Sequence, residues 1–137
     1  VQAAAPAARS FVLHTSHPAR GPAWVAAEVA IGVGESLAGA AEGTAWRLAA
    51  AKAGGAVETD AFANLSLALD PPALPRTVDY STQRLSADAG AREEAGRALA
   101  RVAACCEAFF GDAQDVEGCF SGDGGVTVVQ SRPQPGV

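Results

Sequence analysis

Apolar and polar positions alternate in several short runs along the chain, which is the pattern of β-strands. Two β-prone runs, at residues 113–120 and 126–133, are joined by a Ser-Gly-Asp-Gly-Gly turn and predict a hairpin. Five further runs also predict strands, although the abundance of Ala and Gly makes propensity a weak guide to their ends; these runs are 10–14, 24–31, 44–50, 56–65 and 76–81. Most of the chain is therefore expected to form a sheet.

One stretch has helical periodicity instead. Residues 88–110 carry apolar side chains at helical spacing, with most charged residues on the other side, and Gly111 follows as a helix end. Glu93 and Arg97 are four residues apart and would form a supporting ion pair. The positions expected to face the sheet are Ala95, Leu99, Val102, Cys106 and Phe109. This helix leads directly into the hairpin and can cover its apolar side.

The remaining segments are read as connections. Residues 70–75, Asp-Pro-Pro-Ala-Leu-Pro, predict a linker that cannot be a central strand or a helix. Residues 1–10 are rich in Ala and Pro and are expected to be frayed. The Gly-Val-Gly-Glu-Ser-Leu run at 32–37 follows a predicted strand, so its backbone N–H groups could meet a phosphate, but a plain strand-to-helix turn fits it better.

The predicted hairpin has one polar face. Because side chains alternate along a strand, Asp115 and Glu117 share a face of the first run, as Gln130 and Arg132 do on the second. Glu117 and Gln130 should be cross-strand neighbours, about 5 Å apart at their Cβ atoms. The opposite, apolar side of the hairpin is expected to carry Val116, Val129 and Ser131.

Such a polar face suits a hard divalent cation. Carboxylate and amide oxygens are ligands for Mg²⁺, which completes its shell with water and with nucleotide phosphates. The guanidinium of Arg132 could hold phosphate oxygens in a fork. The alternative is an ordinary hairpin with a solvated polar face, and the pattern alone fits both readings equally.

Composition narrows the function classes. The 137 residues are 49% hydrophobic and 18% charged, which indicates one globular domain. A net charge of −5 argues against a nucleic-acid partner, since phosphate-backbone binding needs a basic face. No apolar run approaches the length of a membrane helix, and the first residues do not have the pattern of a targeting signal.

Cysteine and histidine supply weaker candidates. Three cysteines, two of them adjacent, make neither a disulfide framework nor a C-x-x-C metal site. Cys105 and Cys106 are expected to be small core residues, because no neighbouring basic group would lower their pKa values. His14 and His17 have zinc-ligand spacing, but a strand end and its loop explain them better, since no further ligands stand at suitable spacing.

Three motifs resemble the nucleotide-binding domain of dikinases. Residues 32–37 are similar to its G-L-G-E-T-L motif, 114–118 (Gln-Asp-Val-Glu-Gly) to Q-D-x-E-G, and 129–133 (Val-Gln-Ser-Arg-Pro) to V-Q-S/T-R-P. The motifs occur in the family's order, and the resemblance covers roughly 11–135. The domain with these motifs occurs in the pyruvate, phosphate dikinases, the phosphoenolpyruvate synthases and the glucan, water dikinases. Within this group the phosphoglucan, water dikinases are most similar.

The resemblance implies an α+β fold: the C-terminal subdomain of an ATP-grasp domain, mainly antiparallel sheet with a long packed helix, over residues 1–137. It implies ATP and Mg²⁺ as cofactors, and a plastid location. The ATP β-phosphate would pass through a phosphohistidine to a phosphorylated α-glucan, and the γ-phosphate to water. The implied metal ligands are Glu117, Gln130 and, assisting them, Asp115; the implied nucleotide contacts are Glu35, Gln114, Asp115 and Arg132, with Glu117 and Arg132 catalytic.

Several features of the family have no counterpart in this chain. The first half of the nucleotide site, the phosphohistidine motif and the starch-binding module would lie upstream, so the chain alone is expected to be inactive. Two rival functions remain: a glucan, water dikinase or phosphoenolpyruvate-synthase-like dikinase with another acceptor, and a non-catalytic interaction module of the same fold. Retention of Asp115, Glu117, Gln130 and Arg132 together argues against the second.

Overall fold

The computed structural model describes residues 9–32, 45–64, 67–70, 74–77, 79–121 and 125–137. One six-stranded sheet dominates them, in the spatial order β4-β3-β2-β1-β7-β8, and every neighbouring pair is antiparallel. Its strands are β1 (Arg9–His14), β2 (Trp24–Ile31), β3 (Trp46–Ala51), β4 (Val57–Ala61), β7 (Gln114–Phe120) and β8 (Val126–Pro133). The sequence predicted these strands, but β4 ends four residues early and Arg9 and Ser10, expected to be frayed, lie in β1.

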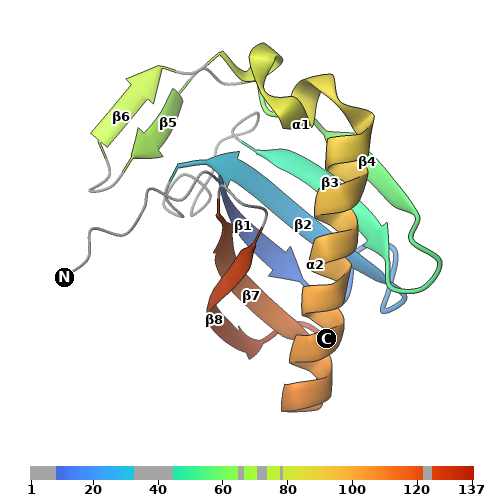
Figure 1. The fold of residues 1–137 in the computed structure, drawn as a ribbon. Helices are drawn as coiled ribbons and strands as arrows, with labels where there is room; N and C mark the ends of the chain where they lie inside the picture. Colours follow the sequence, from blue (N-terminus) through green and yellow to red (C-terminus); the bar gives the residue numbers. More distant parts are fainter. Residues whose placement is uncertain (1–8, 33–44, 65–66, 71–73, 78, 122–124) are drawn as a thin grey trace.

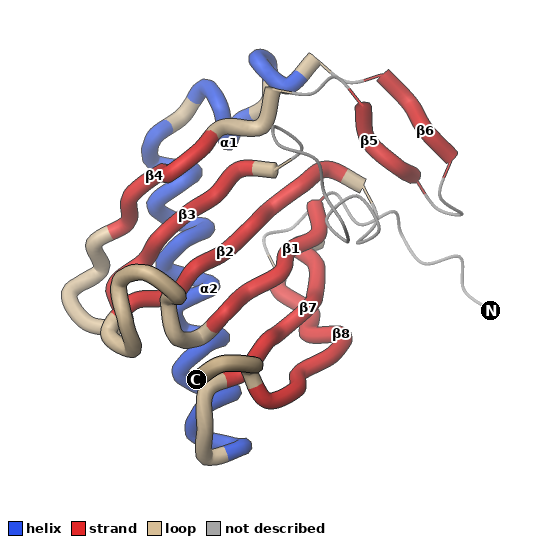
Figure 2. Tube along the Cα trace, turned by 180° about the vertical axis from the view of Figure 1, so that it is seen from behind, coloured by secondary structure: helices blue, strands red, loops and turns tan. Residues whose placement is uncertain are grey.

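A single long helix covers one face of this sheet. Helix α2 (Ala89–Phe110) runs across β3, β2 and β1, whereas the opposite face carries none of the described helices (Figures 1 and 2). The Asp88 side chain caps its start by accepting from the Gly90 N–H at 2.9 Å, and Gly111 ends it in the left-handed conformation. The predicted Glu93–Arg97 ion pair is confirmed at 3.1 Å.

The core lies between α2 and the sheet. Its largest fully buried side chain is Trp46 of β3, whose indole N–H donates to Ser86 Oγ in the short helix α1 (Arg84–Ala87) at 3.0 Å. The buried face of α2 is made mostly of small residues, which allow the helix to approach the strands closely. These residues are Ala91, Ala95, Gly96, Leu99, Ala100, Ala103 and Cys106.

Phe109 was expected on this face, and that prediction is wrong. Its side chain is 81% exposed and stacks edge-on with the half-exposed Phe110, with ring centroids 4.9 Å apart. The reason is geometric: the last turn of α2 extends past the end of the sheet (Figure 1), so the helical period continues where there is no strand left to cover.

The proline-rich region also differs from the prediction. Strands β5 (Leu67–Asp70) and β6 (Leu74–Thr77) form a separate two-stranded sheet, so part of the expected linker is strand. The strand expected at 76–81 ends at Thr77, and a 3₁₀ turn, η2 (Tyr80–Thr82), follows. The Asp79 carboxylate accepts from the backbone N–H and the hydroxyl of Ser81, and these local bonds turn the chain away from an extended path.

Candidate functional site: the open face of the sheet

The sheet face opposite α2 collects the polar side chains of the hairpin. Glu117 of β7 lies directly across from Gln130 of β8, and Asp115 lies across from Arg132. Directly opposed residues in an antiparallel pair project from the same face, so all four share one face of the hairpin. We refer to this surface, the side of the main sheet away from α2, as the open face.

The simplest candidate for a cation site on the open face is the cross-strand pair of Glu117 and Gln130. Glu117 is half-buried and Gln130 exposed, and neither side chain has a hydrogen bond or ion pair to any other described residue. Within the described ranges no three His, Cys, Asp or Glu side chains are grouped closely enough to hold a metal. One carboxylate and one amide fit a Mg²⁺ ion that takes its other ligands from water and a nucleotide's phosphates.

Asp115 is held more tightly. Its side chain is 9% exposed, and its Oδ2 accepts from Arg132 Nε at 3.1 Å and Nη2 at 3.0 Å. Both bonds use one carboxylate oxygen, and the Arg132 side chain is exposed, so the other three N–H bonds of its guanidinium are available for phosphate oxygens. Asp115 Oδ1 makes no hydrogen bond, and His14 Nε2 lies 3.5 Å from it.

Two predicted site residues do not join this group in the described structure: Gln114 projects from the other face, and one further residue is not described. Gln114 precedes Asp115 on the strand and therefore projects from the helix side, where it is 1% exposed. Its side-chain amide donates to Asp112 Oδ1 at 2.6 Å and its carbonyl oxygen accepts from Ser131 Oγ at 2.8 Å, so its polar atoms serve the fold. Glu35 lies outside the described residues.

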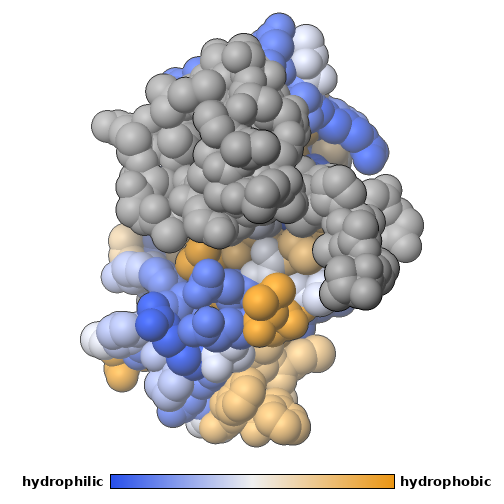
Figure 3. Space-filling view, turned by 90° about the vertical axis from the view of Figure 1, so that its left-hand side faces the viewer, coloured by the Kyte–Doolittle hydropathy of each residue, from blue (hydrophilic) through white to orange (hydrophobic). Residues whose placement is uncertain are grey.

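A bulge in the hairpin changes the direction in which one side chain was expected to point. Glu117 pairs with Gln130 and Gly118 with Val128, which leaves Val129 without a partner on β7. Val129 was predicted on the apolar side, but its side chain is 74% exposed on the edge strand β8. Figure 3, seen from the side of β8, shows hydrophobic atoms at the surface next to hydrophilic ones.

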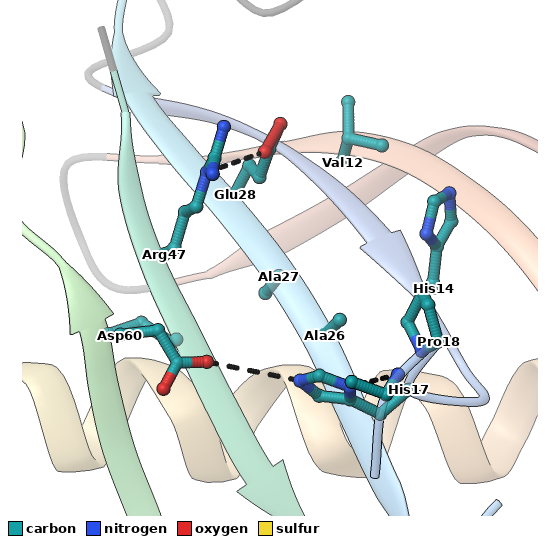
Figure 4. A pocket seen from close by; sticks show the side chains of 11 residues that line it. Val12, His14, His17, Pro18, Ala26, Ala27, Glu28, Arg47 and Asp60 are labelled. Atoms are coloured by element: carbon teal, nitrogen blue, oxygen red, sulfur yellow. Dashed lines mark hydrogen bonds and ion pairs between the residues drawn. The ribbon is translucent and has the colours of Figure 1, made fainter. Parts of the chain in front are cut away.

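Two hollows flank the end of β1 on the open face. The first, of about 400 Å³, has small apolar residues in its floor, including Ala26 and Ala27, under a polar rim (Figure 4). On that rim Arg47 Nε pairs with Glu28 Oε2 at 3.0 Å, and His17 Nε2 lies 3.9 Å from Asp60 Oδ2. The second, of about 430 Å³, is bordered by Asp115 and the chain end; His14, His17 and Pro18 line both.

The sequence analysis did not predict these two hollows or the ion pairs at their rims. The one available signal was Glu28, the single charged residue inside an otherwise apolar predicted strand. Nearby, Arg20 bonds to Glu58 and Asp60, and these partners raise its pKa. His14 and His17 are not a zinc pair in this structure: His17 Nδ1 accepts from the backbone N–H groups of Ala19 and Arg20, which fixes its ring in the loop.

The cysteines follow the sequence prediction only in part: Cys106 is a small core residue, whereas Cys105, which was also expected in the core, lies on the solvent side of α2. Cys106 is buried beneath the sheet, and burial raises the pKa of its thiol, while a hydrogen bond with Ser131 lowers it by less. Cys105 is exposed and Cys119 is partly buried. The described residues also contain no helix with the length and apolar character of a membrane span.

Comparison with known proteins supports a relationship to dikinases. No family model matches the chain. The chain is similar to the "Alpha-glucan water dikinase, chloroplastic" of Citrus reticulata, with 31% identity over 158 aligned residues that include 91% of this chain. It spans 11% of that relative's length. The similarity supports a dikinase relationship in general and does not favour the phosphoglucan-specific group that the motifs resemble most.

Proposed function

We propose that the chain is the C-terminal subdomain of an ATP-grasp nucleotide-binding domain in an ATP-dependent dikinase, and that its open face contacts Mg·ATP. The observation that carries the proposal is the cross-strand pair of Glu117 and Gln130, two oxygen donors with no partner among the described residues. In this α+β arrangement the pair lies on the sheet face that none of the described helices covers, with Gln130 exposed and Glu117 half-buried. The dikinase relative supports the same assignment.

Each residue has a distinct role in this proposal. Glu117 and Gln130 would hold the magnesium ion, which when bound neutralises charge on the phosphates. Arg132 would contact a phosphate oxygen, and Asp115 would fix Arg132 in that position through the two bonds to its Oδ2. Glu35 remains a proposed nucleotide contact from the motif resemblance. Gln114 is assigned a structural role, because its side chain is enclosed on the helix side.

The acceptor is proposed from the motifs and the relative. The β-phosphate would pass by way of a phosphohistidine to an α-glucan, the γ-phosphate would pass to water, and AMP would be released. The motifs favour a glucan that is already phosphorylated, whereas the relative is named for α-glucan itself. Both point to starch metabolism in a plastid. The rest of the site, including the phosphohistidine, would come from other parts of a protein of the relative's length.

The test is made in a protein of the relative's length that contains this sequence, as the proposal requires. Glu117→Gln keeps the side-chain shape and removes its charge, so we expect AMP formation from Mg·ATP and glucan to fall by about 10²-fold or more. Its melting temperature should change little, because Glu117 has no partner among the described residues. Glu58→Gln, which removes an exposed carboxylate at the far edge of the sheet, is the matched control.

Four results of these assays are informative. Full activity in Glu117→Gln would overturn the metal assignment, and a large loss of thermal stability with activity retained would make Glu117 a structural residue. Parallel assays with phosphorylated and unphosphorylated α-glucan decide the acceptor. The 137-residue chain assayed alone should form no AMP, because phosphoryl transfer depends on a nucleotide enclosed from both sides.

A further inference from the structure

His14 stands at the junction of the two hollows, on the same open face as the hairpin's polar group. It is the last residue of β1, and its side chain is 37% exposed. Figure 4 shows its ring at the rim of the first hollow, turned away from His17 and Asp60. Unlike His17, it makes no hydrogen bond within the described residues, so its ring nitrogens are available.

Its neighbour Asp115 has an unused acceptor. Only 9% of the Asp115 side chain is exposed, yet its Oδ1 has no hydrogen bond, while its Oδ2 accepts two. An unbonded buried carboxylate oxygen is costly, which favours an N–H donor close by. His14 Nε2, 3.5 Å away, is slightly beyond hydrogen-bond distance, and a small rotation of the imidazole would close the gap.

This contact would orient the imidazole toward the open face. If Nε2–H donates to Asp115, the neutral ring keeps a lone pair on Nδ1, directed away from the carboxylate. In the sheet, His14 is opposite Asp115, and Glu117 is the next residue on the same face of β7. Diagonal neighbours of this kind are about 7–8 Å apart, a distance that one water molecule and one phosphoryl oxygen can span.

We infer that His14, oriented by Asp115, holds the water molecule that receives the terminal phosphoryl group. This inference rests on the proposed function, in which water is the acceptor of that group. Nδ1 accepts one O–H of the water and thereby directs an oxygen lone pair at the terminal phosphorus. A phosphoryl transfer with a loose transition state depends chiefly on such positioning of the nucleophile.

The step balances as a simple hydrolysis. The water oxygen forms a bond to the terminal phosphorus, and the bond from that phosphorus to its bridging oxygen breaks. The bonding electron pair stays on the bridging oxygen, and the water's proton leaves on the released phosphate. His14 is therefore a residue that touches the reacting water, and Asp115 is a positioning residue that acts through His14.

The test follows where the terminal phosphate goes. The longer protein is incubated with Mg·ATP labelled in its γ-phosphate, in water containing methanol, and orthophosphate is separated from methyl phosphate. In the native protein the held water excludes methanol, so orthophosphate should dominate. In His14→Ala we expect orthophosphate release to fall by about 100-fold, with the affinity for Mg·ATP changed less than about 3-fold. The ratio of methyl phosphate to orthophosphate should rise.

His14→Gln provides the second variant. Its amide N–H can donate to Asp115 and its carbonyl oxygen can accept from water, so both rate and product ratio should lie between native and His14→Ala. An unchanged product ratio in both variants, with native release of AMP and orthophosphate, would overturn the inference and leave the proposed function intact. Absence of AMP and orthophosphate in the native protein would instead overturn the proposed function.

Discussion

Gly96 sets how closely α2 lies on the sheet, and its replacement gives a quantitative test of the packing. A Cβ atom at Gly96 would lie 2.6 and 2.8 Å from the two methyl carbons of Val57 in β4. Contacts below 3.0 Å require the helix or the strand to move, and such overpacking costs about 1–3 kcal/mol. Alanine is favoured over glycine inside a helix by about 1 kcal/mol. Gly96→Ala should therefore lower the free energy of unfolding by about 1 kcal/mol, or the melting temperature by about 4 °C.

In a Val57→Ala background, Gly96→Ala should raise the free energy of unfolding instead of lowering it. In a Val57→Ala background the two methyl carbons are gone, and the nearest remaining atom, the Cβ of residue 57, is 3.3 Å from the new methyl. There the 3.3 Å contact requires a shift of only a few tenths of an ångström, so Gly96→Ala should stabilise the fold by somewhat less than the helix-propensity gain of about 1 kcal/mol. Urea denaturation of the native chain, both single variants and the double variant completes the cycle. Equal effects of Gly96→Ala in both backgrounds would refute the close-contact argument.

Three further substitutions or treatments test other parts of the structure. Gly118→Ala would bring its Cβ into the backbone oxygen of Thr127 and to 2.7 Å from Phe11 Cζ. Urea denaturation should therefore show the free energy of unfolding lowered by about 3 kcal/mol, more than in Gly96→Ala, and a smaller decrease would contradict the bulge geometry. Asp88→Ala removes the N-terminal cap of α2 and should lower the free energy of unfolding by about 1 kcal/mol, whereas Asp88→Asn, which keeps a capping oxygen, should leave it unchanged. Iodoacetamide should alkylate Cys105 well before Cys106 at pH 8, because burial raises the pKa of the Cys106 thiol and less of it is thiolate; equal mass-spectrometric labelling would contradict this.

The hairpin and helix were predictable because their signals are local. Alternation along 114–120 is enough to place Asp115 and Glu117 on one face, and the helical period with Asp88 and Gly111 at its ends locates α2. The same alternation puts Gln114 on the other face, so strand geometry already separates it from the nucleotide side to which the family resemblance assigned it.

The missed features depend on contacts between distant parts of the chain. His14 meets Asp115 only because β1 pairs with β7, and no local pattern in either strand specifies that pairing. The exposure of Phe109 depends on where the sheet ends beneath α2, and the bulge at Val129 on how Gly118 fits between Phe11 and Thr127. Each is a property of two elements together, which a reading of one segment at a time cannot supply.

The pairing of β1 with β7 also bears on the order in which this chain folds. The two strands are neighbours in the sheet, yet the hydrogen bond from Gln114 N–H to Thr15 Oγ at their end joins residues 99 positions apart. Closing a loop of that length costs about 4 kcal/mol of chain entropy before any pairing is gained, whereas β1–β2, β2–β3 and β7–β8 can each form as a local hairpin. The hairpin bearing Glu117 and Gln130 can thus form early but docks late, after α2 has offered a surface to join. During synthesis on the ribosome, the Glu117–Gln130 pair would therefore take its place in the sheet after β1 to β4 have joined.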